Sequence, residues 1–305
     1  YISKELFDDY KTKYNYPHKG EVMITCAGTV GKCVIYDGKD AYYQDSNIVW
    51  IDNPSQYIGN GFLYHLLANV DWRKLNSTTI IRIYNDDLRN LKLSYPQIEE
   101  QKKISRLLSL LDERISTQNK IIEKLESLIK GIAQNIVRYN KPNARLSDCL
   151  SCSSSTLQES DVSEHGTYPV YGANGIVGYL DNYNTENEAI YIIKDGSGVG
   201  STSYVTGKCS ATGTLNILRA KEGYSLQYLY YMLKVFNFEP YKTGMAIPHI
   251  YFKDYGKAKV FCPTYKEQLQ YARLLSAIDK RLTVEHGLLT NLSLQKQYLL
   301  RQMFI

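Results

Sequence analysis

Two glycine-rich stretches are the first candidates for chemistry, because glycine loops cradle phosphates in many nucleotide-binding proteins. They read "CAGTVGKC" from Cys26 and "DGSGVGST" from Asp195. A phosphate loop needs G-x-x-x-x-G-K-[ST], and the first stretch has Cys26 and Cys33 where the first glycine and the hydroxyl residue belong. The second stretch lacks the lysine. We therefore interpret both as tight turns between strands.

The cysteines and histidines form no metal-binding or catalytic pattern. Cys149 and Cys152 make a single C-x-x-C, and a structural zinc site needs a second cysteine or histidine pair at matching spacing, which the sequence lacks. The histidines form neither H-x-E nor H-E-x-x-H, and the Pro-Pro of amino-methyltransferase motifs is missing. We predict no catalytic residue, no metal, and reduced, unreactive thiols.

The composition is that of an ordinary globular protein long enough for two domains. The chain has 305 residues, of which 44% are hydrophobic and 22% charged. No apolar run is long enough to span a membrane and no secretory signal begins the sequence, so we expect a cytoplasmic protein or a fragment.

The net charge of +5 permits an acidic partner, but a solvated basic surface without any partner explains it about as well. The 28 tyrosines suit wet interfaces and nucleic-acid surfaces, or reflect compositional bias.

An internal duplication organises the elements that must position any site. The stretch "YPQIEEQKKISRLLSLLDERI" begins at Tyr95, and "CPTYKEQLQYARLLSAIDKRL" begins at Cys262. With Pro96 set against Pro263, ungapped identities fall at Glu100, Gln101, Leu107, Leu108, Ser109, Asp112, Arg114 and Leu125 of the first copy. The preceding segments correspond more loosely, with Val30-Gly31 against Val199-Gly200. The order is therefore variable unit, repeated helix, variable unit, repeated helix.

Each repeated segment has the apolar spacing of a coiled-coil helix. From Ile104 onward, apolar residues recur at alternating four- and three-residue steps, with Gln118 in one seam position. The second copy has Glu285 in the corresponding position. These polar residues either fix the register of the pairing or sit where the helices splay and both are wet. Because a long apolar stripe must be buried, we predict that the two helices pair antiparallel.

Each variable unit is predicted to combine a strand, a tight glycine turn, a second strand and a short amphipathic helix. In the first unit, "EVMIT" and "KCVIY" flank the turn and "GNGFLYHLLANV" is the helix. In the second, "AIYIIK" and "STSYVTG" flank the turn and "YSLQYLYYMLKVF" is the helix. The fold class is therefore α+β with a pseudo-two-fold internal repeat.

This layout resembles the DNA specificity subunit of type I restriction–modification systems over almost the whole chain. The two helix motifs are the most specific part of the likeness, and "YPVYGANGIVGYLDNY" (168–183) and "GMAIPHI" (244–250) add to it. The resemblance implies two globular α/β target recognition domains separated by two long antiparallel helices. We assign residues 1–96 to the first recognition domain, 97–140 to the first spacer helix, 141–263 to the second recognition domain and 264–305 to the second spacer helix.

The first recognition domain is expected to be incomplete at its N-terminus, because it lacks an equivalent of "NARLSDCLS". In the resembled family each domain reads half of a split site in double-stranded DNA. The resemblance also implies two methylation subunits as partners, and restriction subunits as a further possible partner. No cofactor is expected in this chain, since S-adenosylmethionine belongs to the methylation subunit.

Residues that contact DNA should be cations, hydroxyls and amides on the loops of the variable units. In the first unit these are Thr29, Lys32, Arg73, Lys74, Ser77, Thr78, Thr79 and Arg82. In the second unit they are Tyr171, Asn174, Lys194, Ser197, Ser201, Thr202, Tyr204, Tyr241, Lys242, Thr243 and His249. Ordinary loop solvation is the alternative explanation for each of them.

Two other functional classes remain open from the sequence. One is an enzyme such as a fused methyltransferase or nuclease, against which the missing motifs argue. The other is a coiled-coil scaffold whose units bind proteins, which would show no sequence-selective DNA binding even with its partners present.

Overall fold

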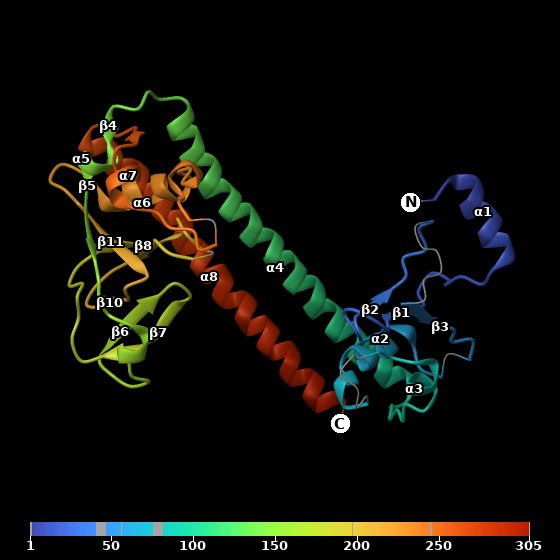
Figure 1. The fold of residues 1–305 in the computed structure, drawn as a ribbon. Helices are drawn as coiled ribbons and strands as arrows, with labels where there is room; N and C mark the ends of the chain where they lie inside the picture. Colours follow the sequence, from blue (N-terminus) through green and yellow to red (C-terminus); the bar gives the residue numbers. More distant parts are fainter. Residues whose placement is uncertain are drawn as a thin grey trace. The chain divides into compact units, whose positions relative to one another are not determined.

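The chain forms two compact units, one of which is assembled from both ends of the sequence. The computed structural model describes residues 2–40, 47–55, 57–75, 82–196, 198–244 and 246–304. Unit 1 comprises Tyr1–Lys120 and Gly287–Ile305, and unit 2 comprises Ile121–His286. Each unit therefore contains part of the two long helices, α4 (Ile98–Arg138) and α8 (Tyr265–Met303), shown in green and red in Figure 1.

Unit 1 is built on a small antiparallel sheet covered by one helix. Its other elements are α1 (Lys4–Lys13), β1 (Val22–Thr25), β2 (Cys33–Ile35), β3 (Ile48–Ile51), α2 (Asn60–Ala68), the 3₁₀ turn η1 (Trp72–Leu75) and α3 (Asn85–Arg89). Strand β1 is central, with β2 and β3 antiparallel on either side. Val22 and Ile24 of β1 pack with Phe62 and Leu67 of α2, which forms the core of the unit.

Unit 2 contains more strands around an equivalent centre. Its other elements are β4 (Ala144–Arg145), α5 (Leu146–Cys149), β5 (Leu150–Ser154), η2 (Glu159–Asp161), β6 (Tyr168–Gly172), β7 (Gly175–Leu180), β8 (Ala189–Ile193), β9 (Thr202–Val205), β10 (Ser210–Ala211), β11 (Leu215–Ala220), α6 (Leu226–Lys234), η3 (Glu239–Tyr241), α7 (Phe252–Tyr255) and β12 (Lys259–Val260). The main sheet has the order β5-β11-β8-β9, with β10-β6-β7 and β12-β4 as separate small sheets.

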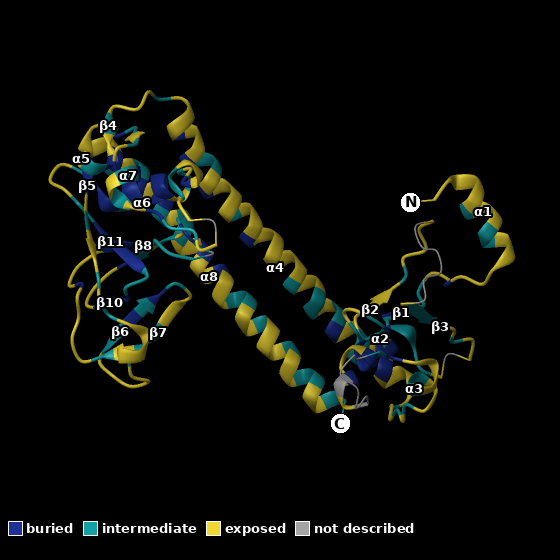
Figure 2. Ribbon diagram, viewed as in Figure 1, coloured by how far each residue is buried: buried dark blue, intermediate teal, exposed yellow. Residues whose placement is uncertain are grey.

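The central strands β8 and β11 and the short helix α6 are largely buried in unit 2 (Figure 2). Strand β8 is buried almost throughout because α6 covers one of its faces. Ser225 begins α6, and its hydroxyl accepts a hydrogen bond from the Tyr228 N–H. Leu226, Leu229 and Leu233 then follow at helical spacing and are all buried.

The long helices follow the predicted heptad seam. Ile122, Ile129 and Ile136 of α4 recur every seven residues and are all buried. In unit 2 the Glu126 carboxylate lies 3.9 Å from the His286 ring, and Ala133 lines the same hollow as Leu282, so α8 runs antiparallel to α4 there. The predicted fold class is confirmed.

The polar seam residues are buried, so the alternative in which both are wet is wrong. Gln118 in unit 1 and Glu285 in unit 2 are each 2% exposed. The Glu285 carboxylate forms an ion pair with Arg281 one turn earlier on α8. Burial of a charged group requires such a partner, because the charge is poorly stabilised by its apolar neighbours.

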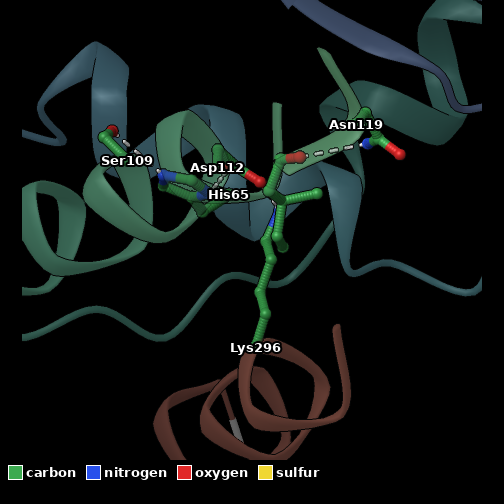
Figure 3. Close-up of polar contacts among 6 residues, drawn as sticks. His65, Ser109, Asp112, Asn119 and Lys296 are labelled. Atoms are coloured by element: carbon green, nitrogen blue, oxygen red, sulfur yellow. Dashed lines mark hydrogen bonds and ion pairs between the residues drawn. The ribbon is translucent and has the colours of Figure 1, made fainter. Parts of the chain in front are cut away.

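A polar cluster joins α2, α4 and α8 inside unit 1 (Figure 3). The His65 ring, 2% exposed, has Nε2 3.4 Å from the Ser109 hydroxyl and Nδ1 3.9 Å from the Asp112 carboxylate. Lys296 of α8 forms an ion pair with the same carboxylate. The buried His65 ring therefore has a polar neighbour at each of its nitrogens.

No helix within the described ranges is long and apolar enough to cross a membrane.

Candidate nucleic-acid interface

The glycine turn between β8 and β9 presents hydroxyl groups to solvent. The Ile193 N–H donates to the Ser201 carbonyl at 3.0 Å, and the Gly200 N–H donates to the Ile193 carbonyl at 2.9 Å. Gly196 and Gly200 have φ of 95° and 91°, a conformation that side chains with a Cβ adopt only at a cost. The closed turn leaves Ser201 exposed and Thr202 half-buried at the start of β9.

A second loop, around residues 243–250, is joined to this turn by backbone hydrogen bonds. The Ile250 N–H donates to the Lys194 carbonyl at 2.9 Å, and the Gly196 N–H donates to the Pro248 carbonyl at 3.0 Å. The His249 Nδ1 lies 2.5 Å from the Asp195 carboxylate, and both side chains are about a third exposed, at 36% and 35%. The Nε2 atom is therefore the ring nitrogen that remains for an external partner.

An open hollow of about 440 Å³ lies beside the same turn. Its lining residues are Val199, Gly200, Ser201, Thr202, Lys234, Phe236, Asn237, Phe238, Glu239 and Lys242. The Lys242 ammonium is 2.6 Å from the Glu239 carboxylate, and the Lys234 ammonium lies 5.0 Å from the Tyr230 ring centre. Cations, amides and hydroxyls around a hollow suit contact with a phosphate backbone.

Lys234 and Asn237 were not among the predicted site residues. Lys234 is the last residue of α6, and Asn237 lies three residues beyond it. Both come directly after the apolar pattern of the helix, so the sequence does not distinguish them from ordinary polar residues at a helix end.

The predicted tyrosines of unit 2 are largely packed inside the unit. The Tyr171 ring makes an edge contact with Tyr191, at 5.8 Å between ring centres, against the sheet core. The Tyr204 hydroxyl donates to Glu188, and burial raises its pKa above the usual value. Tyr241 stacks on Phe236 at 5.8 Å. These tyrosines are therefore half-buried by contacts within their own unit, as is common for aromatic side chains.

The remaining predicted residues of unit 2 occupy two places. Asn174 is exposed at the β6–β7 turn, in a sheet separate from the glycine turn. Thr243 exchanges both backbone hydrogen bonds with His249, so it belongs to the second loop. Ser197 lies outside the described residues.

Unit 1 has the same turn with the same hydrogen bonds. The Thr25 N–H donates to the Lys32 carbonyl at 3.0 Å, and the Gly31 N–H donates to the Thr25 carbonyl at 2.8 Å. Thr29 and Lys32 are exposed on the turn. Within the described ranges, the Lys32 ammonium makes no ion pair.

In unit 1 too, a second loop is hydrogen-bonded to the glycine turn. The Ile83 N–H donates to the Cys26 carbonyl at 2.9 Å, as Ile250 does to Lys194 in unit 2. Arg82 precedes Ile83 as His249 precedes Ile250, so a basic residue occupies the same position in both units. The equivalence agrees with the looser sequence correspondence of the two segments, in which Ile83-Tyr84 matches Ile250-Tyr251.

An aromatic ring lies under each turn. A Cβ on Gly200 would come within 2.9 Å of the Phe238 ring, and one on Gly31 would overlap the Trp72 ring. Trp72 and Phe238 both follow the short helix of their unit. The second glycine of each turn is therefore required by packing as well as by its positive φ.

The other predicted residues of unit 1 lie around η1. The Lys74 ammonium is 3.5 Å from the Asp71 carboxylate on the surface. Arg73 belongs to η1, but its side chain is not described. Ser77, Thr78 and Thr79 fall outside the described residues.

No metal-binding cluster of His, Cys, Asp or Glu occurs among the residues that the structure describes.

Comparison with known proteins assigns the chain to a family. The profile of the "Type I restriction modification DNA specificity domain" matches residues 2–127 and 145–294. This chain belongs to that family. Each match covers one variable unit and much of the long helix that follows it, in agreement with the internal duplication.

Relatives and solved structures of the family extend the likeness. A putative type I restriction enzyme specificity subunit from Haemophilus influenzae is 45% identical over 141 residues, which are 46% of this chain and 36% of the relative. The chain thus spans about a third of that relative's length. The crystal structure of a type I S subunit from M. genitalium has a TM-score of 0.70 at 19% identity, covering 96% of this chain and 85% of that one.

A second solved structure has a TM-score of 0.55 at 17% identity. It comes from work on complex assembly and conformational transition of the type I R-M system. The match covers 94% of this chain and 82% of that chain. At these identities the structural likeness shows a shared fold.

Proposed function

We propose that this chain is the DNA-recognition subunit of a type I restriction–modification complex. Residues 1–96 and 141–263 form two target recognition domains, each reading one half of a bipartite site in double-stranded DNA. Residues 97–140 and 264–305 form spacer helices. The observation that carries the proposal is the pair of equivalent glycine turns, each fastened to a loop with a basic residue at the same position.

The chain acts without catalysis of its own in this proposal. S-adenosylmethionine and the methyl transfer belong to two methylation subunits, and any DNA cleavage belongs to restriction subunits. The long helices offer a docking surface, because each keeps apolar residues in solvent. Leu107 of α4 and Leu274 of α8 occupy equivalent positions and are 42% and 51% exposed. Paired, exposed leucines suit two copies of one partner.

The test is to co-express the chain with its methylation subunits and map the modified adenines in the host DNA. A split motif with a fixed gap is expected. Arg82→Ala should relax one half of the motif, and His249→Ala should relax the other. Lys102→Ala, which removes a paired surface cation on α4, is the control and should leave the motif unchanged.

Salt dependence provides a second measurement on the assembled complex. Removal of Lys32 should weaken DNA binding on all sequences and lower the slope of log affinity against log salt by about 1. An absent motif together with salt-independent binding would favour the coiled-coil scaffold instead.

A further inference from the structure

The sulfur atoms of Cys149 and Cys262 are in contact inside unit 2. Their Sγ atoms are 3.5 Å apart, and the two residues are 0% and 7% exposed. Cys149 ends α5, shortly after α4, and Cys262 lies between β12 and α8, so the two residues lie near the two ends of the segment that connects the long helices. Both are free thiols in the structure.

The backbone around the pair is fixed by several hydrogen bonds. Strands β4 and β12 pair with Ala144 opposite Val260. The Asn143 side chain donates to the Cys262 carbonyl and accepts from the Cys262 N–H, both at 2.8 Å. A disulfide needs the sulfurs about 2.05 Å apart, so rotation of the two side chains must supply the remaining approach on an anchored backbone.

The C-x-x-C spacing of the sequence points to a different pair, which the structure does not bring together. Cys152 lies on β5 opposite Leu218, and its thiol faces the Ser153 carbonyl. Burial raises the pKa of the Cys152 thiol to about 11, which leaves it almost entirely protonated near neutral pH. Cys149 is therefore partnered by a residue 113 positions away.

The two thiols are not equivalent as nucleophiles. The hydrogen bond from Cys262 lowers the pKa of Cys149, and Tyr224 contributes in the same direction. The same hydrogen bond raises the pKa of Cys262. The thiolate forms first at Cys149, and the thiolate is the reactive species toward oxidants. Among the described residues no third His, Cys, Asp or Glu completes a metal site here.

We propose that Cys149 and Cys262 are an oxidation site at which a peroxide forms a reversible disulfide within unit 2. The Cys149 sulfur attacks one peroxide oxygen, the O–O bond breaks, and the departing hydroxide takes the Cys149 proton as water. The Cys262 sulfur then attacks the resulting sulfenic sulfur, the S–O bond breaks, and the second hydroxide leaves with the Cys262 proton. The two cysteines lose two electrons, and hydrogen peroxide is reduced to two waters.

The disulfide links two residues 113 positions apart within unit 2 and so restricts the unfolded chain over a long loop. We expect oxidised protein to melt at least about 5 °C higher in unit 2 than reduced protein. Dithiothreitol should reverse the shift, because the step stops short of sulfinic acid.

The test treats the full chain with hydrogen peroxide, blocks the remaining thiols by alkylation, and maps the cross-links by mass spectrometry. A peptide joining Cys149 to Cys262 is expected in the wild type and in Cys152→Ser and Cys33→Ser. It should be lost in Cys149→Ser and Cys262→Ser. The wild-type map is decisive even if a buried variant folds poorly.

A link between Cys149 and Cys152 would overturn the proposal. So would sulfinic acid at Cys149 with Cys262 still open to alkylation after unfolding. The inference does not depend on DNA recognition, so either result leaves the proposed function standing.

Discussion

Two glutamines at equivalent positions hold the start of the short helix in each unit. Gln268 accepts from the Ser225 N–H and donates to the Pro263 carbonyl, both at 2.8 Å. Gln101 accepts from the Gly59 N–H at 2.9 Å and donates to the Pro96 carbonyl at 2.8 Å. The duplicated motif thus preserves a buried hydrogen-bonding function. The repeated glutamine was visible in the sequence, but the N–H groups from which it accepts were not, because Gly59 and Ser225 lie more than forty residues away from it.

We expect Gln268→Leu to destabilise unit 2 by about 2 kcal/mol, because the Ser225 N–H would be buried without an acceptor. Hydrogen exchange at Ser225 and in α6 measures the effect. Gln270→Leu, at an exposed position two residues further along α8, is the matched control. Equal effects of both substitutions would refute the hydrogen-bonding explanation.

The glycines of the turns differ in how much space surrounds them. Gly196→Ala meets open space and is opposed only by the positive φ, for which about 1 kcal/mol is expected. Gly200→Ala should cost more than Gly196→Ala, because its Cβ also displaces the Phe238 ring. Thermal unfolding of the two variants side by side checks the order, and the reverse order would contradict it.

At the scale of elements, the His65 cluster makes the packing of α2 on α4 sensitive to acid. Burial lowers the pKa of the His65 imidazole below its usual 6.5, with Asp112 opposing and Lys296 reinforcing the effect. The folded unit therefore binds fewer protons than the unfolded chain below neutral pH. Its stability is complete above about pH 6.5 and falls as the pH decreases toward the lowered pKa.

His65→Gln should remove this part of the pH dependence, since glutamine does not titrate and still offers an amide to Ser109. Hydrogen exchange in α2 between pH 7.5 and pH 5 gives the measurement. His165→Gln is the control, because His165 is exposed in a loop of unit 2. If His65→Gln loses protection at acid pH as the wild type does, His65 is not the titrating group.

The long helices and the strand–turn–strand cores were predictable because their signals are local. The heptad seam predicted α4, and the glycines predicted the turns. Sheet order, the inward packing of Tyr171 and the partner of Cys149 depend on contacts distant in sequence. A loop residue such as Lys32 shows only its type in the sequence, and its role as a DNA contact remains a prediction.

At the scale of the whole molecule, the last described residues complete the core of the first unit. Phe304 packs on Phe62 with 5.1 Å between ring centres and joins the cluster around Val22 and Ile24. Duplication of the sequence thus does not mean two independent halves. Unit 2 is contiguous in sequence, whereas unit 1 needs both the early and the late part of the chain.

We expect Phe304→Ala to destabilise unit 1 by about 2 kcal/mol and to leave unit 2 unchanged, because it removes a half-buried ring from one core. Hydrogen exchange across Phe62–Leu67 and across α6 separates the two effects. Tyr298→Ala, which removes an exposed ring from α8 six residues before Phe304, should change neither. Equal loss of protection in both units would contradict the assignment of Phe304 to unit 1 alone.

The discontinuity of unit 1 has a consequence for biosynthesis. The ribosome translates residues 121–286 before residues 287–304, so unit 2 can fold before the residues that complete the core of unit 1 have been synthesised. The Val22–Phe62 core must then wait, partly open, during the synthesis of more than two hundred further residues. Chaperones that bind nascent chains should therefore be found on the first unit for longer than on the second.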